Sequence, residues 1–282
     1  TIQIDYTHPL NIDMIIMKAN KVETGAKVID RNQEMQYTTI SDNQEYYQPT
    51  EVFNYKQRVI ATYLASEWAL SNNITLKTGV RHESTFVSGD WNPSTTNMPF
   101  DTLYHDILPS IRLSKKLGIG KKIKFSYTKR ISRPRTTYIN TNTSRTDNKN
   151  IIEGNPSLFP SNTKQIELGY DHFSKKYQGS YYIYRKTSKD IIQSIVLPIQ
   201  GDTSITTYKN IAKSEKYGFD YYGSIKFNKI TLRMGLNIYN YTTYNEGIQR
   251  KAVLYNYNFG GTANLGNNWK AEAFGFFRSP SQ

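Results

Sequence analysis

Three charged residues with period-two spacing are the first candidates for chemistry in this sequence. Lys77, Arg81 and Glu83 fall at odd positions of one extended stretch, so they share a face if that stretch is a strand. On that face they could contact a ligand or another domain, or they could form neighbouring salt bridges on a hydrated wall. Glu167 and Asp171 also share a face, but four residues along a strand separate them by about 13 Å, which is too far for a glycosidase carboxylate pair.

Other catalytic and metal-binding patterns are missing from the sequence. The four histidines lie on different segments without the spacing of metal ligands: His8, His82, His105 and His172. There is no cysteine, which excludes disulfides, thiolate metal sites and thiol nucleophiles. The Gly-Ile-Gly at 118–120 resembles part of a phosphate loop, but no helix or Lys-Ser/Thr pair follows it, so a turn is expected there. We therefore expect no enzymatic activity, no cofactor and no metal site.

The elements that must position the charged residues are strands. Apolar and polar residues alternate with period two at 123–128, 166–172, 230–239 and 253–265, which predicts strands with one apolar face rather than helices. Strands of about 9–11 residues with one apolar face are long enough to cross hydrocarbon at a tilt. No apolar run approaches the roughly 18 residues that a membrane helix requires.

Connections between the predicted strands alternate between short and long. Short ones of a few residues lie near 10, 72, 118, 175, 228 and 267, and mostly longer ones rich in Asn, Thr, Gly and Pro lie near 40, 95, 147, 200 and 247. In an up-and-down meander this sorting places the short turns at one end and the long loops at the other, as in outer-membrane barrels. A soluble sandwich has no reason to sort its connections in this way. The sequence thus predicts an all-β fold, an antiparallel up-and-down transmembrane β-barrel with about twelve strands in this chain.

Aromatic and basic residues are placed as a membrane interface requires. The chain has 23 Tyr and 12 Phe, and aromatic residues such as Tyr181, Tyr239 and Trp269 gather towards strand ends, like an interfacial girdle. The net charge is +13, with lysines such as Lys115 and Lys175 at the short turns. Charges at the rims of a membrane barrel would face anionic lipid or lipopolysaccharide phosphates, which explains the charge more simply than a nucleic acid does. Outer-membrane lipid and lipopolysaccharide are therefore the expected partners, and nucleic acid is not.

Several short motifs, in their order and spacing, resemble a known family. They are ETGAK at 23–27, FNYKQRVIATY at 53–63, LKTGVRHEST at 76–85, LPS at 108–110, FSYTKRISRP at 125–134, GNPSL at 154–158 and ELGY at 167–170. Together they resemble the barrel of Bacteroidetes-type TonB-dependent receptors, within the related outer membrane protein β-barrel family.

The resemblance implies a barrel of about 22 strands, plugged by an N-terminal domain and energised by a TonB-type periplasmic partner. It also implies the outer membrane of a Gram-negative, Bacteroidetes-type bacterium. The plug and an aromatic-ended closing strand are missing from the sequence, so 1–282 is interpreted as an outer-membrane barrel segment. We expect either part of a larger barrel or a smaller barrel of about twelve strands, because lipid does not tolerate unpaired strand edges.

Three functions remain open at this point: a receptor barrel for uptake of a nutrient ligand, a structural or assembly-scaffold barrel without transport, and a soluble β-rich binding module. A surface lipoprotein or another outer-membrane subunit is a further candidate partner of a barrel. In the receptor hypothesis the candidate ligand-facing loop residues are Trp91, Arg133, Arg135 and Tyr138. The candidate lumen-facing charged residues are Lys77, Arg81, Glu83, Glu167, Asp171 and Arg233.

Overall fold

The structure is a computed structural model that describes residues 1–13, 18–37, 51–92, 99–141, 144–145, 149–199, 202–245, 247–266 and 269–280. Its elements, in chain order, are β1 (Ile2–Asp13), β2 (Lys18–Tyr37), β3 (Glu51–Ser71), β4 (Ile74–Asn92), β5 (Phe100–Gly118), β6 (Lys121–Ser132), α1 (Thr136–Ile139), β7 (Ser144–Arg145), β8 (Asn150–Ile152), β9 (Ser161–Phe173), β10 (Tyr177–Pro198), β11 (Ser204–Phe227), β12 (Ile230–Asn245), β13 (Ile248–Gly266) and β14 (Trp269–Arg278). Among the described residues no helix is long and apolar enough to cross a membrane.

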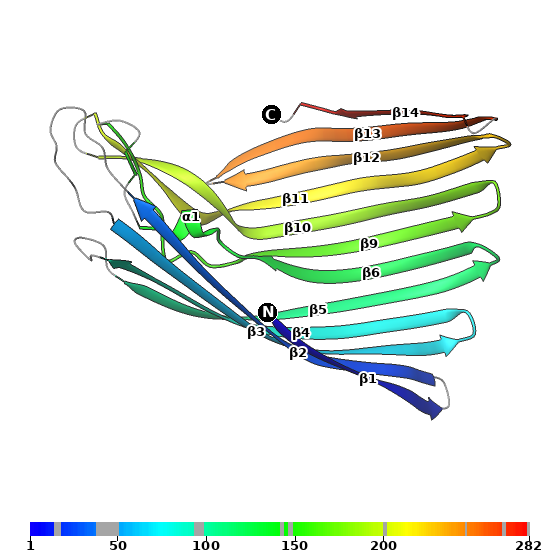
Figure 1. Ribbon diagram of the computed structural model, residues 1–282, viewed down its shortest axis with the longest axis horizontal. Coiled ribbons are helices and arrows are strands. Elements are labelled where there is room, and N and C mark those ends of the chain that lie inside the picture. Colours follow the sequence, from blue (N-terminus) through cyan, green and yellow to red (C-terminus); the bar gives the residue numbers. More distant parts are fainter. Residues whose placement is uncertain are drawn as a thin grey trace.

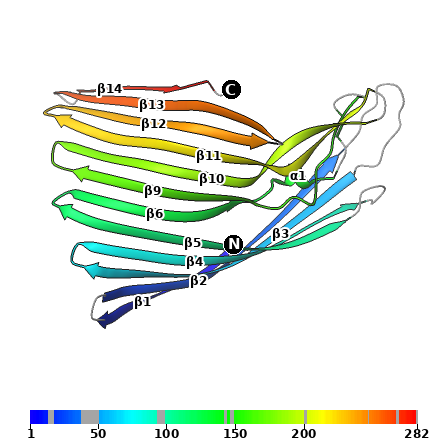
Figure 2. The ribbon, with the colours of Figure 1, turned by 180° about the vertical axis from the view of Figure 1, so that it is seen from behind.

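One curved antiparallel sheet forms the molecule (Figures 1 and 2). Its main path follows the chain through β1 to β6 and then β9 to β14, with β1 and β14 at the two edges. This is the up-and-down meander of about twelve strands that the sequence predicts, so the predicted fold class is confirmed. The short β7 and β8 lie off the path, and β8 pairs in parallel with β11.

Several predicted connections lie where expected, and two differ. Strands end and restart at Ser71 and Ile74, and again at Phe227 and Ile230. The connection expected near residue 10 is wrong, because Pro9 lies within β1 and pairs with β2. The connection near 247 is also shorter than expected, since only two residues separate β12 from β13.

The two faces of the sheet have opposite chemistry over most of its width. Directly paired residues on nine successive strands form one apolar row, comprising Trp68, Leu76, Leu113, Phe125, Leu168, Ile183, Phe219, Ile238 and Tyr255. We call this side the apolar face. One residue along, the opposite side carries a polar row formed by Glu67, Lys77, Arg112, Ser126, Glu167 and Tyr184, and we call this side the polar face.

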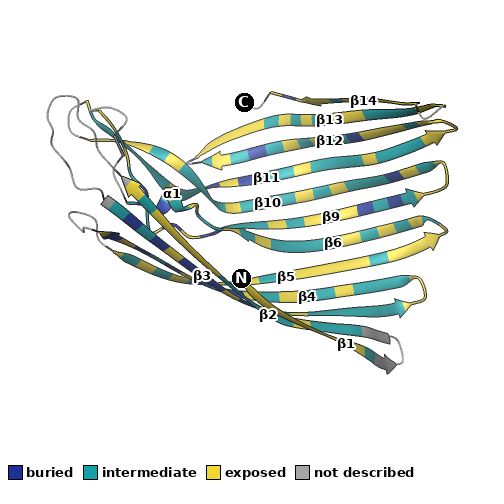
Figure 3. Ribbon diagram, in the orientation of Figure 1, coloured by how far each residue is buried: buried dark blue, intermediate teal, exposed yellow. Residues whose placement is uncertain are grey.

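The apolar face is uncovered in the described residues. Ile107 is 60% exposed and Val253 is 61% exposed, and Figure 3 shows exposed positions repeating along the strands towards the short turns. A two-layer soluble core would bury these side chains under a second sheet, but the described strands form one sheet. An apolar surface this extensive needs lipid as its partner.

The strands are longer than a membrane requires. β11 has 24 residues, which corresponds to roughly 80 Å of extended chain, whereas the hydrocarbon core is about 30 Å thick. Buried residues concentrate on β3 and β4 near α1, at the end of the sheet that carries the long connections (Figure 3). The strands therefore project beyond the hydrocarbon at that end and build a small protein core there.

Candidate functional site

Between β6 and β9 the structure describes residues 133–141, 144–145 and 149–160, and contacts from both ends of this connection lie on the polar face. We call these described residues the inner segment. In Figures 1 and 2 its helix α1 lies between the far ends of β2–β4 and those of β10 and β11. Pro134 follows the last residues of β6, and proline cannot donate to a strand ladder, so the chain leaves the sheet there. The segment therefore lies on the face that a barrel directs to its lumen.

Ionic contacts attach the start of the inner segment to β4. Arg133 Nε donates a hydrogen bond to Thr85 Oγ1 at 3.1 Å, and its guanidinium also bonds the Glu83 carboxylate. Arg81 binds the same carboxylate from its own strand. The Glu83 side chain is only 8% exposed, so this buried carboxylate is balanced by two guanidinium groups.

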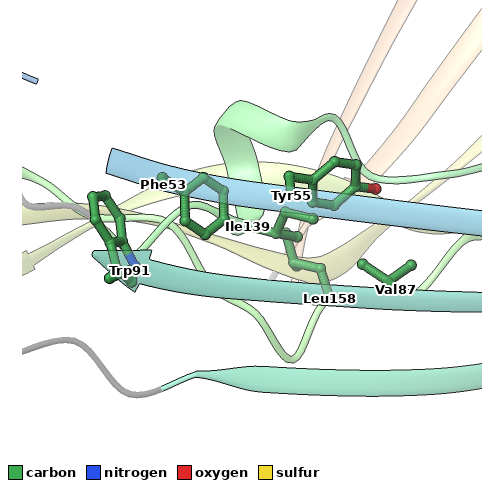
Figure 4. Packing of buried hydrophobic residues seen from close by; sticks show 6 residues of the cluster. All are labelled: Phe53, Tyr55, Val87, Trp91, Ile139 and Leu158. Carbon is green, nitrogen blue, oxygen red and sulfur yellow. The ribbon is translucent and has the colours of Figure 1, made fainter. Parts of the chain in front are cut away.

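An apolar core holds the middle of the inner segment (Figure 4). Ile139 and Leu158 pack against residues of β3 and β4, namely Phe53, Tyr55, Val87 and Trp91. The Phe53 and Trp91 rings lie 4.8 Å apart, and the indole N–H of Trp91 donates to Thr141 Oγ1 at 3.0 Å. These contacts fix the segment against the wall.

The far side of the inner segment is tied to β11. The Tyr138 ring stacks on Tyr208 at 4.3 Å, and Asn155 Nδ2 donates to the Tyr208 carbonyl at 2.8 Å. Gly154 N–H donates to the Asn140 carbonyl at 2.9 Å, and a Cβ on Gly154 would lie 2.1 Å from that oxygen. This close approach explains the glycine of the GNPSL motif, since any larger residue would push the two turns of the segment apart.

An open pocket of about 600 Å³ lies between the inner segment and strands β2 and β3. Its polar lining includes Arg31, Gln57, Arg133, Arg135 and Thr136. Arg31 Nη1 donates to Gln57 Oε1 at 3.3 Å, and Arg135 lies over the Tyr138 ring with 5.8 Å between its guanidinium carbon and the ring centre. The pocket therefore offers several N–H donors and three positive charges.

A second polar network lies on the polar face nearer the short turns. Asp171 pairs with Lys124 and accepts hydrogen bonds from Ser180 Oγ at 3.0 Å and from the Tyr182 hydroxyl at 3.2 Å. The Asp171 side chain is only 4% exposed. Its carboxylate is thus saturated by three partners from the two neighbouring strands, β6 and β10, which suits a wall that lines a hydrated cavity.

Replacing Asp171 with alanine is expected to lower the free energy of unfolding by about 1–3 kcal/mol, because Lys124, Ser180 and Tyr182 would lose their shared acceptor. Urea titration of the protein folded into lipid vesicles measures the change. The control is Glu272→Gln, which breaks the exposed ion pair to Lys270 and should change stability by less than about 1 kcal/mol. Equal effects would contradict a structural role for the Asp171 network.

All six residues predicted to face the lumen lie on the polar face. Lys77 Nζ is 2.7 Å from Glu67 Oε2 on the adjacent strand. Glu167 accepts a hydrogen bond from Gln165 Nε2 at 3.2 Å, and the exposed Arg233 donates to Thr262 Oγ1 at 3.3 Å. Arg81, Glu83 and Asp171 are in the two networks above. Their roles in binding a ligand or a plug stay predictions.

The four residues predicted to face a ligand from the loops separate into two groups. Arg133 and Arg135 line the pocket, whereas Trp91 belongs to the apolar core and Tyr138 packs against that core. Sequence reasoning missed Arg31 and Gln57, which line the pocket from strands β2 and β3. Period-two alternation could have placed both residues on the polar face. Arg31 lies on the same face of β2 as Gln33 and Met35, and Arg31 pairs directly with Gln57 of β3.

A single antiparallel meander with a continuous apolar face, a polar opposite face and short turns at one end defines an outer-membrane β-barrel protein. The chain belongs to the outer membrane protein β-barrel family, whose model matches residues 1–282. This confirms the predicted resemblance to the outer membrane protein β-barrel family.

Comparison with solved structures supports the same fold. The ferric-catecholate import receptor Fiu from E. coli K12 is similar with a TM-score of 0.67 and 12% identity, over 96% of this chain and 43% of that one. The alcaligin outer-membrane receptor FauA from Bordetella pertussis has a TM-score of 0.63 and 16% identity, over 98% and 45%. The ferric yersiniabactin uptake receptor FyuA from Yersinia pestis has a TM-score of 0.62 and 12% identity, over 91% and 38%. The chain thus spans less than half the length of these structures. A comparison with curated protein sequences found no match.

Proposed function

We propose that this chain is the barrel portion of a TonB-dependent-type receptor that takes up a nutrient ligand across the outer membrane. The observation that carries the proposal is the inner segment, which is fixed to the polar face by ionic contacts and an apolar core and leaves a pocket beside it. A receptor needs an ordered ligand-facing surface inside the loop end of its barrel. The fold shared with uptake receptors is consistent with this function.

The alternative within the same fold is a structural or assembly-scaffold barrel. Such a barrel needs the lipid-facing band, but it has no requirement for a pocket on the polar face. Outer-membrane lipid and lipopolysaccharide are partners of the barrel in either function. A receptor has two more partners: a plug domain inside the barrel and a TonB-type periplasmic protein that energises it. A further proposed partner is a surface lipoprotein or another outer-membrane subunit, bound at the long loops. The proposed host is a Bacteroidetes-type bacterium.

A depletion experiment tests uptake while the ligand is still unidentified. Deletion and complemented strains are grown in complex medium, with and without a protonophore, and the remaining solutes are measured by mass spectrometry. We expect at least one solute to be removed only by the complemented strain with an intact proton gradient. If no solute differs and the deletion instead alters outer-membrane assembly, the scaffold function replaces the receptor function. The complete gene product offers an independent check, because a plug and a TonB box are expected in a receptor.

A further inference from the structure

We propose that the pocket between the inner segment and strands β2 and β3 binds a small molecule that carries carboxylate or phosphate groups. Three arginines from two parts of the chain line this pocket. Arg31 belongs to β2, and Arg133 and Arg135 belong to the inner segment. The guanidinium group matches the geometry of carboxylate and phosphate oxygens, to which it donates two parallel hydrogen bonds. The inference names the ligand class of the proposed receptor, and its biological meaning rests on that function.

The charge of the pocket is only partly balanced by the protein. Arg133 shares the Glu83 carboxylate with Arg81, so one negative charge faces two positive ones. Within the described part of the chain no salt bridge involves Arg31 or Arg135, and no carboxylate lines the pocket. Clustered positive charge that is only partly neutralised, in a concave site, attracts an anion.

The neutral lining suits the same class of ligand. The Gln33 amide, whose oxygen accepts a hydrogen bond from the Thr136 hydroxyl, supplies N–H donors beside the arginines, and Tyr55 and Met35 supply apolar surface. The volume of about 600 Å³ falls within the usual range for small-molecule sites. The pocket lies on the polar face, away from the lipid-facing side, so its ligand is a dissolved molecule rather than a lipid headgroup.

Two of the arginines can be replaced without disturbing the attachment of the inner segment. Among the described residues Arg31 bonds to the neighbouring Gln57, and Arg135 contacts the Tyr138 ring, whereas Arg133 anchors the segment to β4. The test variant is therefore Arg31→Gln with Arg135→Gln. The matched control is Arg58→Gln, which removes the same type of charge from the opposite face of the sheet, where Arg58 pairs with Asp30.

Isothermal titration calorimetry of the complete protein in detergent tests the inference. Citrate represents carboxylates, pyrophosphate represents phosphates, and sucrose is the neutral probe. We expect at least one anion to bind, sucrose not to bind, and the double variant to lose about tenfold or more in affinity, because charge-assisted hydrogen bonds are removed. The control should stay within about twofold of the parent, since screening weakens distant surface charges. Whichever anion binds identifies the preferred oxyanion.

Other outcomes overturn the inference. It fails if neither anion binds the parent protein, if the double variant binds as tightly as the parent, or if Arg58→Gln weakens binding as much as the double variant does. Gel mobility of unheated samples verifies that each variant is folded. Calorimetry requires no energised transport, so anion binding by a protein that depletes no solute would overturn only the uptake function. Uptake without anion binding would overturn only the ligand class.

Discussion

Replacing Leu168 with arginine is expected to destabilise the membrane-inserted protein by about 2–4 kcal/mol, the penalty for a cationic side chain near the bilayer midplane. Leu168 lies in the apolar row between its paired neighbours Phe125 and Ile183. It is five residues from the end of β9 at Phe173, which is about 16 Å along the strand and therefore near the middle of the hydrocarbon. Leu168 is 45% exposed in the protein, so protein atoms cannot shield the new charge from lipid.

Ser126→Arg is the matched control for this variant. Ser126 lies at nearly the same depth, but on the polar face, where it pairs with Glu167. A charge added there is hydrated and has an acidic neighbour, so we expect a change of less than about 1 kcal/mol. Folding equilibria in lipid vesicles over a urea series measure both. If the two variants lost the same stability, the assignment of the apolar face to lipid would be wrong.

Local alternation is why the fold could be predicted from the sequence. On β9, Ile166 and Leu168 alternate with Gln165 and Glu167, and one period-two pattern fixes both the strand and its two faces. Two of the turns could also be predicted, at Asn228-Lys229 and near Gly266. Asn228 and Gly266 both have positive φ, a backbone conformation that interrupts strands. Short-range rules of this kind do not depend on the rest of the chain.

The inner segment could not be predicted because its contacts are distant in sequence. Ile139 packs against Phe53 and Val87, but the loop around it has no periodic pattern that indicates burial. Arg133 was recognised as a candidate ligand contact, yet nothing local indicated that it pairs with Glu83, fifty residues away. The extension of the strands beyond the membrane was missed for a related reason. Beyond the membrane, inward residues of β3 and β4 pack against the inner segment and do not line a hydrated lumen, so the alternation typical of a membrane strand no longer applies.

Replacing Phe53 with alanine is expected to lower the stability of the loop-end core by about 3–5 kcal/mol, the usual range for a buried phenylalanine. Phe53 is 0% exposed, and its ring lies 4.8 Å from that of Trp91 and 6.4 Å from that of Phe100. Ile139 belongs to the same cluster. Removing the ring therefore leaves a cavity directly beneath the inner segment, and the segment loses the surface on which it packs.

The loss should be concentrated in the inner segment, because the strands keep their ladders. Hydrogen exchange should accelerate across residues 133–160, and trypsin should cut sooner after Arg135, while exchange near Leu168 stays unchanged. Phe86→Ala is the control, since Phe86 lies on the apolar face and is 43% exposed; its removal leaves no enclosed cavity and should not affect the segment. If Phe53→Ala left exchange at 133–160 unchanged, packing would not be what holds the segment. If exchange does accelerate, the pocket should also bind anions more weakly, because Arg133 and Arg135 are carried by the segment that this core supports.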